Sequence, residues 1–138
     1  MIQVAFDLLS DIKALLISIT TDIYGDLPSD KDICIAIAHT GGLDPEHTFS
    51  GGNATLQKPK IIKPSFQVVI RHPSEHLLHE MEDLIKTALD GKTNYTPSGT
   101  SRTYLVILQN GDILDGGRDS SRRHIHYLNF HTEIINAY

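Results

Sequence analysis

Two stretches of the chain repeat apolar side chains at the spacing of an amphipathic helix. Residues 2 to 20 form the first, and its polar side carries Asp7, Ser10, Asp11 and Lys13. The second follows Pro73, with Ser74 as a suitable N-cap and Gly91 as the residue expected to end it. Its apolar stripe is expected to hold Leu77, Leu78, Met81, Leu84, Ile85, Ala88 and Leu89.

Four segments are predicted to be strands because they are short and rich in β-branched or aromatic residues. They are residues 32–40, 65–72, 100–109 and 122–135. Asn110-Gly111 predicts a hairpin in which residues 112–114 return beside the third strand, followed by a turn-rich insert over 115–121. Helices and strands do not alternate as βαβ units. The sequence therefore predicts an α+β fold with a single mostly antiparallel sheet, two main helices on one face, and long inter-strand arms.

Residues 43–64 are a long excursion between the first two strands, with three prolines, an adjacent glycine pair and no regular period. They carry the apolar side chains Phe49, Leu56, Ile61 and Ile62. Ordering such residues costs entropy that only burial offsets, so we expect an arm that packs on a neighbouring subunit. The alternative is a loop that folds back over its own sheet.

Length and charge limit the class of protein. The 138 residues suit one domain spanning 1–138. The net charge is −5 with neutral histidines, and no long basic run suggests a surface that wraps nucleic acid. We expect no signal peptide, since the first residues lack a positive segment, and no membrane span. Cys34, inside an apolar run, is expected to be an unreactive core residue.

Three histidines lie in the last predicted strand. Strand alternation puts His124 and His126 on one face and His131 on the other. A His-x-His pair on a strand can supply two zinc ligands, but a third and a fourth are not evident. We therefore expect no metal ligand here, and we interpret these histidines as solvated or interface-facing.

A second polar cluster lies on one face of the predicted second helix, at His76, His79, Glu80 and Asp83. The two histidines are three apart and the glutamate follows the second, so the zinc-protease spacing is not met. No G-x-S-x-G elbow or phosphate loop is present. The sequence predicts no catalytic or cofactor-binding residue and no cofactor. One alternative is a small metal-dependent enzyme using His76, His79, His124 and His126.

Three blocks carry a resemblance to a known family. They are "IAIAHTGG" (35–42), "KPSFQVVIRHPS" (63–74) and "GGRDSSRRHIHYLNFHTEI" (116–134). In this order they resemble the small tail terminator or tail-completion proteins of long-tailed bacteriophages, often labelled minor capsid proteins. The matching positions are Gly41, Gly42, Phe66, Gln67, Arg71, Arg118, Asp119, Asn129 and Phe130.

The resemblance implies a structural virion protein and not an enzyme. Such proteins form a homo-hexameric ring that caps the tail tube, stops its polymerisation and joins the tail to the head's completion or connector protein. Double-stranded DNA passes through the opening without specific binding. The expected location is the tail–neck region of the virion, after assembly in the bacterial cytoplasm. Charge pairs among Arg118, Asp119, Arg122 and Arg123 are expected to set the register between subunits, and Arg71 is also expected at the interface. A head-side neck component is the alternative.

Overall fold

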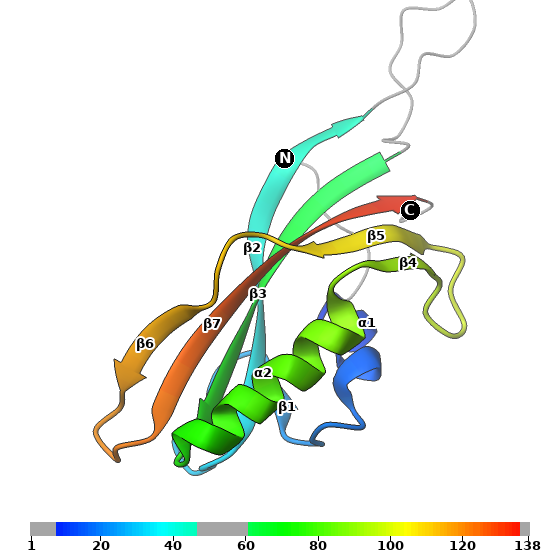
Figure 1. Ribbon diagram of the computed structural model, residues 1–138. Helices are drawn as coiled ribbons and strands as arrows, with labels where there is room; N and C mark the ends of the chain where they lie inside the picture. Colours follow the sequence, from blue (N-terminus) through cyan, green and yellow to red (C-terminus); the bar gives the residue numbers. More distant parts are fainter. Residues whose placement is uncertain (1–7, 47–60, 136–138) are drawn as a thin grey trace, which may run out of the picture.

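The computed structural model describes residues 8–46 and 61–135, and for residues 42–46 it describes the backbone alone. These residues form two helices and a seven-stranded sheet (Figure 1), which confirms the predicted α+β class. No helix among them is both long and apolar enough to span a bilayer. In chain order the elements are α1 (Leu8–Leu16), β1 (Ile23–Tyr24), β2 (Cys34–Glu46), β3 (Ile61–His72), α2 (Glu75–Leu89), β4 (Lys92–Tyr95), β5 (Thr103–Gln109), β6 (Leu114–Arg118) and β7 (His124–Ile135).

The sheet has the strand order β1–β2–β3–β7–β5–β4, and β6 also pairs with β7. Only the short β1–β2 pair is parallel among these strands, so the sheet is mostly antiparallel, as predicted. The long strands β3 and β7 pair from Ile61 opposite Ile135 to His72 opposite His124. They form the centre of the sheet, and the functional candidates lie around their two ends.

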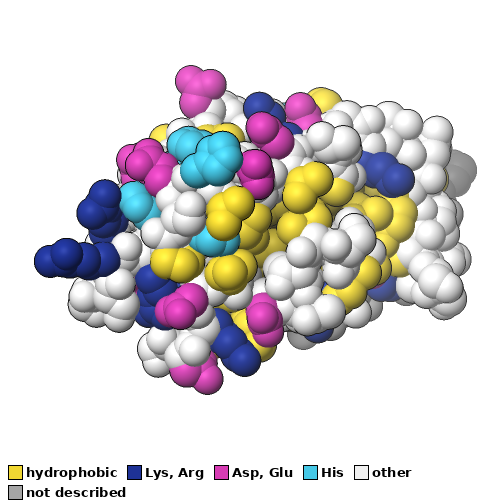
Figure 2. Space-filling model, turned by 60° about the horizontal axis from the view of Figure 1, so that its bottom comes forward, with side chains coloured by type: hydrophobic (Ala, Val, Ile, Leu, Met, Phe, Trp, Pro, Cys, Tyr) yellow, Lys and Arg dark blue, Asp and Glu magenta, His cyan; other side chains and the backbone are white. Residues whose placement is uncertain are grey.

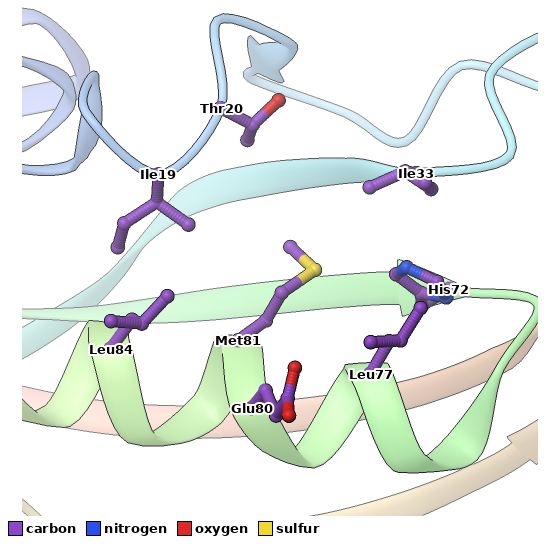
Figure 3. A pocket seen from close by; sticks show the side chains of 8 residues that line it. All are labelled: Ile19, Thr20, Ile33, His72, Leu77, Glu80, Met81 and Leu84. Atoms are coloured by element: carbon purple, nitrogen blue, oxygen red, sulfur yellow. The ribbon is translucent and has the colours of Figure 1, made fainter.

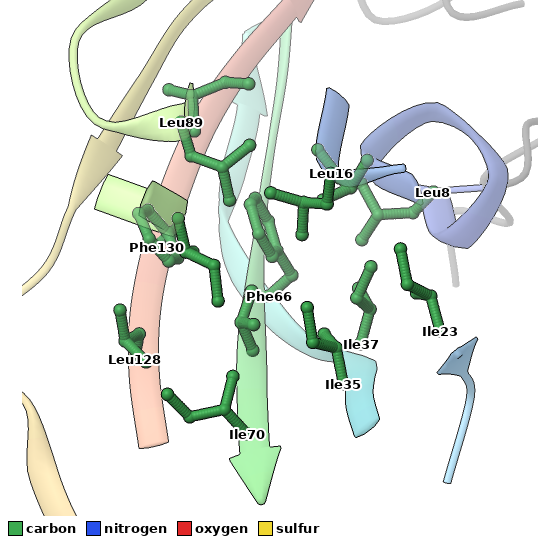
Figure 4. Close-up of a cluster of buried hydrophobic side chains, with 14 of the residues drawn as sticks. Leu8, Leu16, Ile23, Ile35, Ile37, Phe66, Ile70, Leu89, Leu128 and Phe130 are labelled. Carbon is green, nitrogen blue, oxygen red and sulfur yellow. The ribbon is translucent and has the colours of Figure 1, made fainter. Parts of the chain in front are cut away.

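The hydrophobic core lies between one face of the sheet and the two helices (Figures 1 and 4). Phe66, Val68 and Ile70 of β3 are buried together, which confirms the predicted alternation of that strand. Phe66 lies opposite Phe130 of β7, and their rings stack with centroids 5.2 Å apart. On the other face Gln67 donates a hydrogen bond to Asn129 at 3.1 Å.

Helix α2 begins as predicted, because the Ser74 hydroxyl accepts a hydrogen bond from the backbone N–H of Leu77 at 3.4 Å. Its buried side, however, differs from the predicted stripe. Leu77 and Leu84 are 43% and 54% exposed and lie beside the core, not in it. The residues that face the sheet are Leu78, Met81, Glu82, Ile85 and Leu89. The predicted buried stripe was therefore wrong, because the true one is rotated around the helix axis by about one residue position. The rotation places Glu82 on the buried side.

Helix α1 ends earlier than predicted. It stops at Leu16, and the N–H of Ile19 then bonds the Leu16 carbonyl at 2.9 Å in a turn. The following residues, ISITTDI, are rich in β-branched side chains, which lose rotamer freedom in a helix. Residues 2–7 of the predicted helix lie outside the described part of the chain.

The prediction that Asp11 lies on the polar side of α1 is wrong, because the residue is buried at 3% exposure. Its carboxylate accepts hydrogen bonds from Arg102 Nε at 2.7 Å, Arg102 Nη2 at 2.6 Å and the Tyr104 hydroxyl at 2.7 Å. Tyr95 of β4 donates to the Asp11 carbonyl at 2.8 Å. Burial and Asp11 raise the pKa of Tyr104, so its hydroxyl stays protonated and donates. This network fastens α1 to β4 and β5.

The strands are longer and differently connected than predicted. Residues 43–46 and 61–64, expected in the loop, extend β2 and β3, and residues 92–95 form the unpredicted β4. Asn110-Gly111 does not reverse the chain. β5 pairs with the second half of β7 and β6 with the first half, both antiparallel, so the dipeptide makes a bend between two segments of similar direction. The Asn110 N–H bonds the Asn129 carbonyl of β7 at 2.7 Å, which holds this bend against β7.

Candidate functional site

An arginine–aspartate cluster closes one end of the sheet. Arg71, the penultimate residue of β3, and Arg123, just before β7, are both buried, at 4% and 7% exposure. Arg123 Nε donates to Asp119 Oδ2 at 2.8 Å, and Arg71 Nη1 lies 3.9 Å from the same oxygen. The backbone N–H and side chain of Arg123 hold the pKa of Asp119 below its usual value. The turn from Asp119 to Arg123 is therefore rigidly fixed within the subunit.

The same two arginines also bind the segment that precedes β2. Arg123 Nη1 donates to the carbonyls of Ser29 at 3.1 Å and Lys31 at 3.0 Å. Arg71 Nη2 donates to the carbonyls of Pro28 and Lys31. Guanidinium groups suit this role, because they offer several donors in a fixed plane. These contacts tie the β1–β2 connection to β3 and to the turn before β7.

The residues expected at a subunit interface thus fall into different environments. Arg71, Asp119 and Arg123 pair with one another inside the subunit. Arg118 at the end of β6 and Arg122, whose φ is +62°, are exposed at the tip that this cluster holds. Ile62 is buried in the core and Ile61 is half-buried. Phe49 and Leu56 lie outside the described residues.

Strand β2 presents a long edge. β3 covers one side of it, and β1 covers the other side only at Ile35 and Ala36 among the described residues. From Ile37 to Glu46 the backbone of β2 is therefore the outer edge of the sheet. In Figure 1 the far ends of β2 and β3 extend beyond both helices. No other described strand covers this edge, and an edge of this length is a ready template for a strand of another chain.

An apolar groove runs beside α2, between that helix and the segments around β1 and β2 (Figure 3). Its volume is about 250 Å³. Figure 2 shows hydrophobic side chains gathered on this face of the molecule. Leu77, Leu84 and Ile33 are exposed because they line this groove, together with Ile19 and Met81.

A His–Glu–His cluster lies where the beginning of β7 meets α2. His79 Nδ1 lies 3.1 Å from Glu82 Oε2, and His126 Nδ1 contacts Glu82 Oε1. The two imidazole rings meet edge to face with centroids 5.6 Å apart. Glu82 and His126 are buried, whereas the His79 side chain is 54% exposed. The hydrogen bond to Glu82 raises the pKa of His79. In Figure 2 histidine side chains lie next to acidic ones.

The expectation that these histidines are solvated or interface-facing is wrong for His126, which is 6% exposed and bonded to Glu82. The helical histidines behave as an exterior face, since His76 and His79 are largely exposed. The four-histidine arrangement does not form among the described residues, because the metal-competent group holds His79 and His126 with Glu82, without His76 or His124. Sequence reasoning missed Glu82, although its spacing from Leu78 and Ile85 places it inside the apolar stripe.

Cys34 is buried, as predicted, and burial raises the pKa of its thiol. His72 is also buried, and burial lowers the pKa of its imidazole. Its Nδ1 accepts a hydrogen bond from the Ser74 N–H at 2.9 Å, which requires that nitrogen to be unprotonated. Neither residue stands in a triad or dyad that activates a nucleophile among the described residues.

Comparison with known proteins identifies this arrangement of elements. A family model described as bacteriophage tail terminator protein matches residues 7–135. A chain from a solved structure titled "Virion of native gene transfer agent (GTA) particle" has a similar fold, with a TM-score of 0.61 and 11% sequence identity. The similarity covers 99% of this chain and 100% of that one. No curated protein matches the chain in sequence.

Proposed function

Because the chain belongs to the bacteriophage tail terminator family, we propose that it forms a closed ring on the end of the tail tube, where it stops tube growth and joins tail to head. The family is one of structural virion proteins, so the chain is a structural tail protein of a phage and not an enzyme. The expected absence of enzymatic function is thereby confirmed, and the metal-dependent enzyme is no longer a candidate. The match over residues 7–135 is the observation that carries the proposal.

The sheet edge supports assembly with further copies of the chain. The outer edge of β2 from Ile37 to Glu46 carries backbone donors and acceptors without a strand beside them in the described part of the subunit. A strand or arm from the next copy would satisfy these groups. Each subunit then receives on its edge an arm from one neighbour and extends its own arm to the edge of the other. A head-to-tail contact of this kind must close into a ring or continue as a filament, and a tail tube end selects the ring. Six copies are proposed.

The exposed arginines support a second contact. The Arg71–Asp119–Arg123 cluster holds the backbone of the tip that carries the exposed Arg118 and Arg122, so both charges stay at this end of the subunit. Fixed charges at the rim of an interface select register and orientation more than they add affinity. We assign these two residues to the contact with a neighbouring subunit or with the tube protein. The net charge of −5 suits an opening through which DNA passes without being held.

The test is binding to tube ends. The untagged chain is mixed with purified tail tubes, and the ends are imaged by electron microscopy while light scattering gives the mass of the free chain. We expect rings at tube ends. Arg118→Glu combined with Arg122→Glu should reduce the capped fraction about tenfold or more, because rim charges of the wrong sign repel the partner.

Lys92→Glu on β4 is the matched control, since Lys92 is also exposed and lies away from this tip. It should leave capping unchanged. Binding along the sides of the tubes, or a chain that remains single at tube ends, would contradict the ring. Attachment to isolated heads and not to tubes would instead identify the head-side neck component.

A further inference from the structure

We propose that His79, Glu82 and His126 form a binding site for a divalent transition metal, with Zn²⁺ as the ion of choice, that ties α2 to the first half of β7. The inference concerns a site within one subunit and goes beyond the proposed ring function. It also departs from the sequence-based expectation of no metal ligand, because the third ligand is a residue that the sequence analysis did not assign.

The donor set is the first argument. Two imidazole nitrogens and a carboxylate are ligands that zinc accepts in proteins, with a fourth position left for water. One ligand atom from each residue lies within 4.8 Å of the others. A zinc ion about 2.0–2.2 Å from each ligand needs ligand atoms about 3.3–3.6 Å apart in a tetrahedron. The separation of 3.1 Å between His79 Nδ1 and Glu82 Oε2 is already close to this value.

The fold holds two of the three ligands in place. Glu82 and His126 have side chains only 6% and 8% exposed, packed between α2 and the sheet. His79 and Glu82 are three residues apart on α2, so they lie on neighbouring turns of one side of the helix. His79 is half exposed and gives an ion a path from solvent. The site is thus preorganised on its inner side and accessible on its outer side.

The second nitrogen of each histidine faces a carboxylate. His126 Nε2 lies 3.5 Å from Asp115 Oδ1 of β6, and His79 Nε2 lies 3.8 Å from Glu75 Oε1. When Nδ1 binds a metal, Nε2 carries the proton, and a carboxylate that accepts this proton orients the ring and raises its basicity. Both histidines therefore have a carboxylate near the outer nitrogen, at separations longer than an ideal hydrogen bond.

The charge of Glu82 is the third argument. A buried carboxylate is costly unless a cation or several donors compensate it. In the described part of the chain, the ion pairs of Glu82 are with His79 and His126, and none involves lysine or arginine. Neither partner is a permanent cation, and His79, whose pKa Glu82 raises, supplies a positive charge only when it is protonated. A divalent ion supplies the charge and is held by the same three side chains.

Metal binding to the full-length chain, purified without a histidine tag, tests the site. Equilibrium dialysis against Zn²⁺ followed by elemental analysis should give one ion per chain. Co²⁺ should bind in its place with the visible absorption of a tetrahedral N/O site. His79→Ala should retain the fold, because the side chain is 54% exposed, and should weaken Zn²⁺ binding about a hundredfold or more, beyond the 10–100-fold range of outer-partner changes.

His76→Ala is the control, since His76 lies on the same helix, is exposed and pairs only with Glu80 among the described residues. It should leave binding unchanged. Zn²⁺ should also raise the unfolding midpoint of the wild-type chain and of His76→Ala, but not that of His79→Ala. Binding well below one ion per chain, or equal binding by His79→Ala and His76→Ala, would overturn the proposal. In that case only hydrogen bonds hold the two histidines and Glu82 together.

Discussion

The buried Asp11 carboxylate gives the sharpest test of how the helical layer is fastened to the sheet. Asp11→Asn keeps the shape of the side chain but removes the charge that Arg102 and Tyr104 bind. Removing one partner of a buried ion pair costs about 3–5 kcal/mol. Because the Arg102 side chain is 18% exposed and can turn toward water, we expect about 3 kcal/mol here. For a chain of this size that loss lowers the melting temperature by roughly 10 °C.

The assay is urea unfolding followed by circular dichroism. Asp83→Asn is the matched control at an exposed position of α2, and it should change the free energy of unfolding by no more than about 0.5 kcal/mol. A double-mutant cycle of Asp11→Asn with Tyr104→Phe should give a coupling energy of about 1 kcal/mol, since the first removes the charge of the acceptor and the second removes the donor of the same hydrogen bond. Equal costs for Asp11→Asn and Asp83→Asn, or an additive double mutant, would refute the network.

Three further changes probe other parts of the fold. Gly116→Ala should cost about 1–3 kcal/mol and loosen β6, because an added Cβ would overlap the ring of Tyr127; an unchanged urea midpoint would show that β6 is not packed on β7. Ser74→Ala should cost about 1 kcal/mol through loss of the α2 cap, and Ser74→Asn should retain most of the stability. Burial lowers the pKa of His72, so the unfolded state binds the extra proton first and stability falls as pH drops below about 6.5. His72→Asn, which keeps an acceptor for the Ser74 N–H, should flatten the pH dependence below about pH 6.5, and identical slopes for both proteins would contradict it.

Much of the fold was predictable because hydrophobic periodicity reports burial directly. The alternation of residues 65–72 and 122–135 identified the inner faces of β3 and β7, and Ser74 identified the start of α2. The pairing of the strands was harder to predict from the sequence. Asn110-Gly111 has the composition of a tight hairpin, but β7 is long enough to pair with β5 and β6 in succession, so tertiary pairing decided the connection.

The buried carboxylates were the main failure. Asp11 lies three residues after Leu8 and one before Ile12, and Glu82 lies between Leu78 and Ile85 at helical spacing. Both therefore fall inside an apolar stripe, which was a usable signal. Asp11 was predicted on the polar side and Glu82 received no assignment, since charged residues are rarely buried without partners. Those partners come from strands far away in the sequence, and spacing along the chain does not reveal them.

The assignment of residues to a subunit interface stays a prediction, and the positions of those residues within the subunit were only partly predictable. The arginines around residues 118–123 were recognised as a cluster, yet the sequence did not distinguish the buried from the exposed ones. That distinction depends on the segment before β2, whose carbonyls accept hydrogen bonds from Arg71 and Arg123. The partners are at least 40 residues apart in the sequence for Arg71 and more than 90 apart for Arg123.

The length of tail tubes assembled with the chain tests most directly the claim that it caps the tube as a ring. Purified tube protein is allowed to polymerise with and without the chain, and the lengths of the tubes are measured by electron microscopy. If the chain caps the growing end as a closed ring, tubes should stop elongating in proportion to the chain added, each bearing one ring at the capped end. Tubes that keep growing at an unchanged rate beneath a stoichiometric excess of the folded chain would contradict the account.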